Sequence, residues 1–96
     1  MIHDFEVYKA MALSTAHLTE EDNEALHYRA QVVRTMVTER EYGYLMKLCM
    51  DEAMDVDEAY SPALNGVIQF AIKEGFQLIE FDRDAPVSEQ FQQFEW

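Results

Sequence analysis

The sequence predicts a small α/β domain, in the broad sense that includes α+β folds: a sandwich of two main helices and a three-stranded or mixed sheet. Three stretches lead to this class, namely a capped helix followed directly by an apolar strand at 61–81, a run of alternating residues at 5–13, and an apolar run at 42–50. A second helix signal lies between the first two strands. The expected order is therefore strand, helix, strand, helix, strand, with an aromatic tail, all within one domain spanning residues 1–96.

The first strand is predicted at Phe5–Leu13, where side chains alternate with the period of two that is typical of a strand. Thr19 is a good N-cap, and acids fill the turn after it, so a helix should begin near Glu20. Its apolar stripe continues towards Val37, yet this part of the chain is rich in β-branched residues. The range 32–41 is therefore left open between helix and strand.

The second strand is predicted at Tyr42–Met50, with Gly43 as a bulge or a point where two backbones approach closely. The acidic stretch 51–58 follows it. Because burying carboxylates is costly, we expect this stretch to be a solvated loop.

The second helix is the best-defined element and should run from Pro62 to Glu74. Ser61 is suited to the N-cap, proline is tolerated at the first helical position, and Gly75 suits a left-handed C-terminal cap. Apolar residues on both faces of Phe76–Phe81 predict a central strand covered on both sides.

Helices are expected mainly on one face of the sheet. If the second and third strands are parallel neighbours, their crossover through the second helix should be right-handed. The segment Asp82–Pro86 should end the last strand and turn the chain. Aromatic residues of the tail are then expected to lie back on the sheet.

Composition excludes some classes of function but does not identify one. With 49% hydrophobic and 12% aromatic residues, the chain has enough apolar material for a small core. Its formal net charge is −12, which argues against direct binding to nucleic acid or to an anionic membrane and favours a basic protein partner. Eleven of the acids but only two of the bases fall in residues 51–96, so the negative charge is concentrated there.

The single cysteine, Cys49, can close no disulfide within the chain, and a buried hydrophobic role is expected for it. The sequence shows no signal-peptide pattern and no apolar run long enough to cross a bilayer. These features predict a cytoplasmic protein.

Four short motifs stand at the ends of the predicted elements: Ser14-Thr15-Ala16-His17, Tyr42-Gly43-Tyr44, Asp82-Arg83-Asp84-Ala85-Pro86 and Phe94-Glu95-Trp96. Together they resemble a small domain-of-unknown-function family of bacterial, phage and mobile-element proteins. The range 32–41 does not fit the resemblance. The resemblance implies a compact stand-alone domain and implies no activity, cofactor or catalytic residue.

A first candidate site combines His17 with Asp82 and Asp84, which follow two different strands. Strand ends are where ligands bind in α/β sheets, and a histidine with a carboxylate could act as a general base or a metal-ligand pair. The alternative is structural: Ser14, Thr15 and His17 would satisfy the amides of the first helix, and the aspartates would cap a turn.

A second candidate is a calcium site at Asp51, Asp55 and Asp57. An EF-hand needs glycine at its sixth position and glutamate at its twelfth, where this loop has Val56 and Pro62. The motif is therefore excluded. No cofactor and no metal are expected.

The function expected from these features is a non-enzymatic acidic interaction module that mimics the charge of nucleic acid and binds a basic host protein. The expected binding residues are acids of two segments: Asp51, Glu52, Asp55, Asp57, Glu58, Asp82 and Asp84. Two alternatives stay open, a small hydrolase or metal-dependent enzyme using His17 with the two strand-end aspartates, and a structural homodimer.

Overall fold

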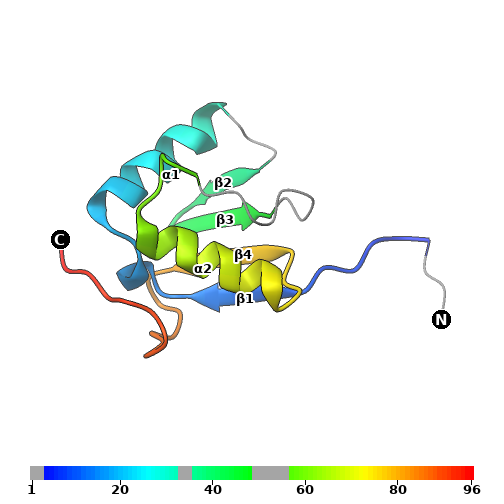
Figure 1. Ribbon diagram of the computed structural model, residues 1–96. Coiled ribbons are helices and arrows are strands. Elements are labelled where there is room, and N and C mark those ends of the chain that lie inside the picture. Colours follow the sequence, from blue (N-terminus) through cyan, green and yellow to red (C-terminus); the bar gives the residue numbers. More distant parts are fainter. Residues whose placement is uncertain (1–3, 33–35, 49–56) are drawn as a thin grey trace.

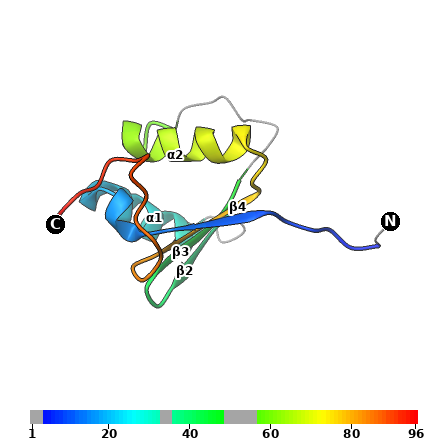
Figure 2. The same ribbon diagram turned by 90° about the horizontal axis from the view of Figure 1, so that it is seen from below.

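A computed structural model describes residues 4–32, 36–48 and 57–96. Within these residues, the chain forms a four-stranded mixed sheet with its two α-helices packed on one face (Figures 1 and 2). The elements in chain order are β1 (Ala10–Leu13), the 3-10 helix η1 (Thr15–His17), α1 (Glu20–Val32), β2 (Val37–Arg40), β3 (Gly43–Lys47), α2 (Pro62–Lys73) and β4 (Leu78–Asp82). The predicted α/β class, mixed sheet and helical pair are confirmed.

The strand order in the sheet is β1-β4-β3-β2, so β4 is an inner strand as predicted. β1 runs parallel to β4, whereas β3 runs antiparallel to both of its neighbours. The expected second and third strands, β3 and β4, are thus antiparallel, and the condition for a right-handed crossover between them is not met.

The prediction of three strands was short by one. The range left open between helix and strand contains the end of α1 and then β2, which forms a hairpin with β3 around the turn at Glu41 and Tyr42. The helical periodicity and the β-branched residues typical of a strand overlap there because α1 and β2 follow one another within a few residues.

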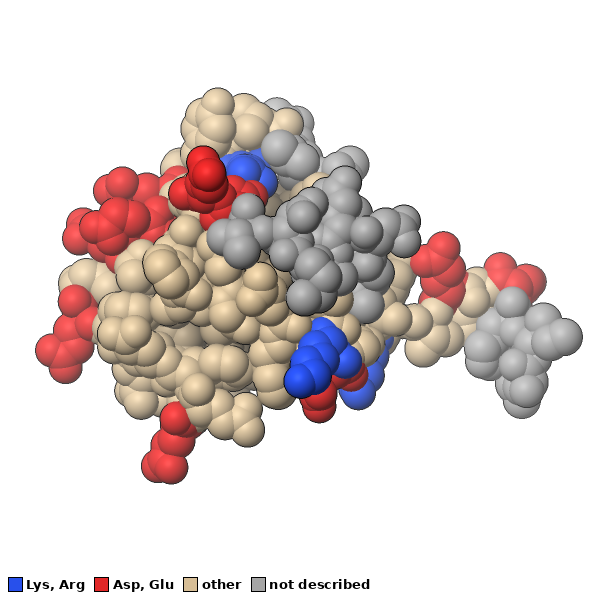
Figure 3. Space-filling view, viewed as in Figure 1, with Lys and Arg blue, Asp and Glu red and all other residues tan. Residues whose placement is uncertain are grey.

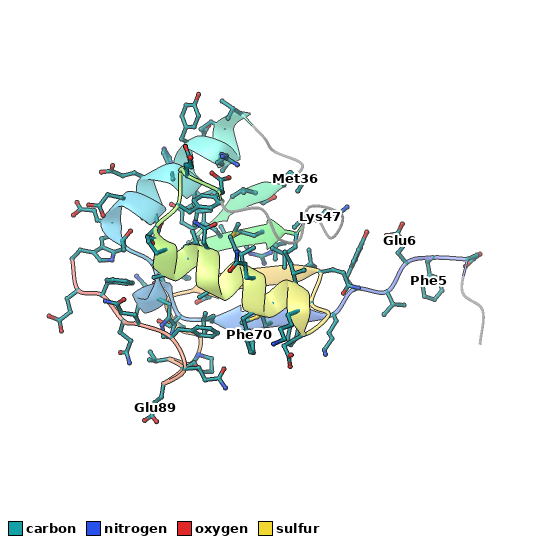
Figure 4. The ribbon with its side chains drawn as sticks, in the orientation of Figure 1. Phe5, Glu6, Met36, Lys47, Phe70 and Glu89 are labelled. Atoms are coloured by element: carbon teal, nitrogen blue, oxygen red, sulfur yellow. The ribbon has the colours of Figure 1, made fainter. Side chains whose placement is uncertain are left out.

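The first strand is shorter than predicted. Only Ala10–Leu13 is paired in register with β4, although the Lys9 carbonyl oxygen still accepts from the Gln77 N–H at 2.8 Å. The exposed segment before Lys9 extends away from the domain, as Phe5 and Glu6 show in Figure 4. Ala10 lies opposite Leu78, and the chain before Leu78 is still turning out of α2. The alternating pattern of 5–8 therefore has no strand paired with it within the described residues.

Helix α2 has the predicted caps. The Ser61 hydroxyl accepts a hydrogen bond from the Leu64 N–H at 3.1 Å, and Gly75 has a φ of 85° directly after the helix. This positive φ is the left-handed conformation that glycine adopts without strain. Pro62 occupies the first helical position as expected.

The prediction that β4 is covered on both faces was wrong. Ile79 and Phe81 are fully buried, whereas Leu78 and Glu80 on the opposite face are only partly buried. Both helices lie over the face that carries Ile79 and Phe81 (Figure 2). Glu80 instead pairs with Arg40 across the open face, with Oε2 3.3 Å from Nε.

The core lies between that sheet face and the helices. Its fully buried apolar side chains are Leu18, Leu26, Leu64, Val67, Ala71, Ile79 and Phe81. Gly43 marks the close backbone approach predicted for it, because a Cβ at this position would lie 1.7 Å from the Phe81 carbonyl oxygen.

The tail does not lie on the sheet as predicted. Its Phe94 N–H donates to the Ala16 carbonyl oxygen in η1 at 2.8 Å. The Phe91 ring packs edge-on against Phe70 of α2, with centroids 5.3 Å apart. The tail therefore covers the end of the domain next to η1 and α2.

Candidate functional site

His17 is fully buried in η1, where it holds the tail. The Ser88 N–H donates to its Nε2 at 2.9 Å, so Nε2 is the unprotonated nitrogen and Nδ1 carries the proton. Nδ1 in turn donates to the Gln92 carbonyl oxygen at 2.9 Å. The Phe91 ring meets the imidazole edge-on at a centroid distance of 5.9 Å. Both ring nitrogens are thus committed to backbone groups of the tail.

Two further contacts complete this attachment, which we call the tail clamp. The Ser14 N–H donates to the Pro86 carbonyl oxygen at 3.0 Å. The indole N–H of Trp96 donates to the Leu18 carbonyl oxygen at 2.9 Å. The Ser14 hydroxyl caps η1 by accepting from the Ala16 N–H, whereas Thr19 and Asp22 cap α1.

Asp82 and Asp84 close the turn after β4. The Asp84 N–H donates to Asp82 Oδ1 at 2.8 Å, and the Ala85 N–H donates to the Asp82 carbonyl oxygen at 3.0 Å. In the described part of the chain, no hydrogen bond or ion pair joins either carboxylate to His17. The structure therefore does not assemble these three residues into a hydrogen-bonded catalytic group.

The acidic segment before α2 is described only from Asp57 onward, and Asp51, Glu52 and Asp55 lie outside the described residues, as does Cys49. Glu58 is exposed. Asp57 is held in place: its Oδ2 lies 2.8 Å from Arg29 Nη2, and its Oδ1 accepts from the Ala59 N–H.

Asn65 fixes the same turn from within α2. Its buried amide accepts from the Asp57 N–H and donates to the Asp57 carbonyl oxygen, both at 2.9 Å. Asp57 thus anchors the chain where it enters α2, and its carboxylate is less available to a partner than that of Glu58.

Asp22 is a buried carboxylate that the sequence analysis did not single out. Its Oδ1 accepts from the Ser61 N–H at 2.7 Å, and its Oδ2 accepts from the Ser61 hydroxyl at 2.6 Å and from the Thr19 N–H at 3.1 Å. It therefore joins the first turn of α1 to the N-cap of α2. Its place three residues after a threonine N-cap is the available sequence signal.

One group of exposed acids lies toward the end of the domain that carries the start of α1 and the tail, and other exposed acids lie elsewhere. We call this group the acidic face and define it as Glu20, Glu21, Glu24, Glu58, Glu89 and Glu95. Figure 3 shows their charge over the start of α1, before α2 and along the tail. In Figure 4, Glu89 points away from the domain. Most of these acids were not among the predicted binding residues, because sequence alone does not reveal that α1 and the tail lie at the same end of the fold.

Two adjoining cavities form a groove at the carboxyl ends of β1 and β4. Their volumes are about 260 and 440 Å³, and both are lined by Thr15, Arg83 and Trp96. The hairpin turn closes one side with Glu41 and Tyr42, and the tail closes the other with Glu95. We call this feature the strand-end groove.

Two buried tyrosines have shifted acidities. Burial raises the pKa of Tyr44 above its ordinary value of 10.0, and the nearby Glu39 carboxylate raises it further. The Tyr44 hydroxyl donates to Asn23 at the groove. Burial also raises the pKa of Tyr60, against the lowering effect of Arg29, and the Asp57 and Asp22 carboxylates add to the rise.

The described residues include no group of three or more histidine, cysteine or acidic side chains arranged to hold a metal ion. In the same residues, no helix has both the length and the apolar character needed to cross a membrane.

A comparison with protein-family models identifies the family of the chain. The model of a family of unknown function, described as the DUF5983 C-terminal domain, matches residues 10–96. This confirms the resemblance found in the sequence. No curated protein and no solved structure matches the chain significantly.

Proposed function

Because the chain belongs to the DUF5983 family of unknown function, which carries no assigned activity, we propose a function from the domain's own surface. The domain is a non-enzymatic acidic interaction module that binds a basic surface on another protein. In its most concrete form, it mimics the charge of nucleic acid and occupies the binding surface of a nucleic-acid-binding protein.

The observation that supports this proposal is that the acidic face stands on elements fixed in space. The start of α1 is capped by Thr19 and Asp22, and the turn beside Glu58 is held by Asn65. The tail clamp fixes the segment that carries Glu89 and Glu95. Carboxylates on a rigid frame present a constant negative field, which favours fast and selective association with a basic partner.

The remaining charges reinforce this field. Across the whole chain, the formal net charge is −12. The exposed bases of the described part of the chain are Lys9, Arg40, Lys47, Lys73 and Arg83. None of them belongs to α1 or follows Arg83 in the tail.

The two alternative functions have less support. An enzyme using His17 would need a ring nitrogen able to exchange a proton or bind a metal, and both nitrogens already bond to the tail. A homodimer would bring together two copies that each carry a formal charge of −12, which opposes their association at low salt.

The test starts with affinity capture of partners from a bacterial lysate, followed by measurement of each purified partner's Kd. We expect the affinity to fall steeply as salt rises, because exposed charges are screened over about 8 Å at physiological ionic strength. Duplex DNA should compete with the domain for the same partner.

Charge-reversal variants distinguish the effect of the acidic face on binding from the effect of net charge alone. The variant Glu24→Lys/Glu58→Lys/Glu89→Lys should weaken binding mainly through slower association. The matched variant Asp4→Lys/Glu6→Lys/Glu74→Lys changes the net charge equally but lies outside the acidic face, and it should weaken binding less. A partner whose affinity ignores both salt and the first variant would refute the proposal.

A further inference from the structure

The strand-end groove has an unbalanced charge. Its two arginines are already engaged, because Arg40 pairs with Glu80 at 3.3 Å, and Arg83 lies 4.0 Å above the Tyr42 ring and 3.9 Å from Asp84. Glu39, a third charged lining residue, bonds to His27. In the described part of the chain, the lining residues Glu41 and Glu95 have no ion pair or hydrogen bond from their side chains.

Trp96 gives the groove an exposed aromatic surface. It lines both cavities and is 59% exposed. Its indole N–H is tied to the Leu18 carbonyl oxygen at 2.9 Å, which fixes the orientation of the ring. A fixed and accessible indole beside carboxylates that lack a cation is the combination that binds a guanidinium group, through stacking on the ring and pairing with the acids.

We propose that the strand-end groove binds an arginine side chain of a basic protein partner, with the guanidinium on Trp96 and paired with Glu41 and Glu95. The inference rests on the proposed function, because it names the place on this acidic domain where the partner is recognised. Arginine is favoured over lysine because a planar guanidinium can stack on the indole and bond to carboxylates at the same time.

The site can be tested with short oligo-arginine, oligo-lysine and oligo-glutamate peptides. Trp96 is the sole tryptophan of the chain, so tryptophan fluorescence reports on the groove directly. We expect oligo-arginine to change the emission in a saturable way and to bind more tightly than oligo-lysine of equal length. Calorimetry measures the same binding without relying on the groove.

The deciding variant is Glu41→Gln/Glu95→Gln, which should weaken oligo-arginine binding by about three- to tenfold. Its control, Asp4→Asn/Glu74→Gln, removes the same charge outside the groove and should leave the affinity within about twofold.

The outcomes separate the two proposals. Calorimetry could show binding while Trp96 emission stays unchanged and the two double variants weaken binding equally. That result would refute the arginine site in the groove but would leave the proposed acidic interaction module in place. If neither basic peptide binds, the proposed function itself is refuted. Binding of oligo-glutamate in preference to oligo-arginine would show that Arg83 makes the groove an anion site and would also refute the inference.

Discussion

The ionisation of Tyr60 makes the stability of the domain depend on pH in the alkaline range. The residue is buried next to α2, with the Arg29 guanidinium 5.3 Å from its ring centroid. Its pKa is raised above 10.0 in the fold, mainly by burial. The folded state therefore favours the protonated phenol, so the stabilisation is fully present below pH 10 and is lost as the pH rises through the folded pKa.

The first prediction is that thermal stability falls between about pH 9 and about pH 11, and that part of this fall is absent in Tyr60→Phe. The phenylalanine variant keeps the buried ring and removes the ionising group. Melting curves by circular dichroism over this range would measure the difference. Identical pH profiles for the two proteins would show that Tyr60 does not contribute.

Two glycines give a second prediction at the scale of single residues. Gly43→Ala should destabilise the domain by about 3 kcal/mol or more, because the new Cβ would meet the Phe81 carbonyl oxygen at 1.7 Å and two strands would have to separate. Gly66→Ala is its control, since nothing lies within 4 Å of that Cβ position in α2. It should stabilise the domain by about 0.5–1 kcal/mol, as measured by urea unfolding.

Among the elements, the tail depends most on one side chain. His17→Ala removes two hydrogen bonds to the tail and leaves a cavity beside Phe91, which should cost about 2–4 kcal/mol. Release of the tail would also free the Trp96 indole from Leu18 and shift its fluorescence to longer wavelength. The exposed His27→Ala serves as the control, and an unchanged Trp96 emission in His17→Ala would contradict the tail clamp.

The sequence predicted an element well where capping and periodicity agreed. For α2, Ser61, Pro62 and Gly75 marked both ends, and the structure confirms them. Phe5–Leu13 was predicted too long because alternation records which side chains share a face, while pairing depends on where the neighbouring strand begins. β2 was left open because it is only four residues long and begins at Val37, soon after α1 ends at Val32.

The site was harder to predict than the fold, because it depends on segments that meet only in space. Thr15, Glu41, Arg83 and Trp96 come from four parts of the chain, and no local pattern connects them. His17 was considered as a general base, a metal ligand or a partner of the first helix, whereas its ring nitrogens bond to the tail at Ser88 and Gln92. These two partners carry no sequence signal, because both contribute backbone atoms.

For the whole molecule, the charge opposes compaction. A formal net charge of −12 on 96 residues repels itself more strongly in the folded than in the expanded chain. We therefore expect the melting temperature to rise when sodium chloride is increased from about 0.01 to about 0.15 M, since the Debye length falls from about 30 to about 8 Å. The variant Glu24→Lys/Glu58→Lys/Glu89→Lys should show a smaller rise. A melting temperature that falls with salt would mean that the ion pairs, such as that of Arg29 with Asp57, outweigh the repulsion.

The parallel pairing of β1 with β4 imposes an order on events during synthesis. Lys9 bonds to the side chain of Gln77, 68 residues later, and Ala10 lies opposite Leu78. By the time β4 is synthesised, the β2–β3 hairpin and both helices have already been made. β1, in contrast, cannot pair with β4 until β4 has left the ribosome. We therefore expect β1 and η1 to remain without their native neighbours while most of the chain is translated, and the sheet and the strand-end groove to form late.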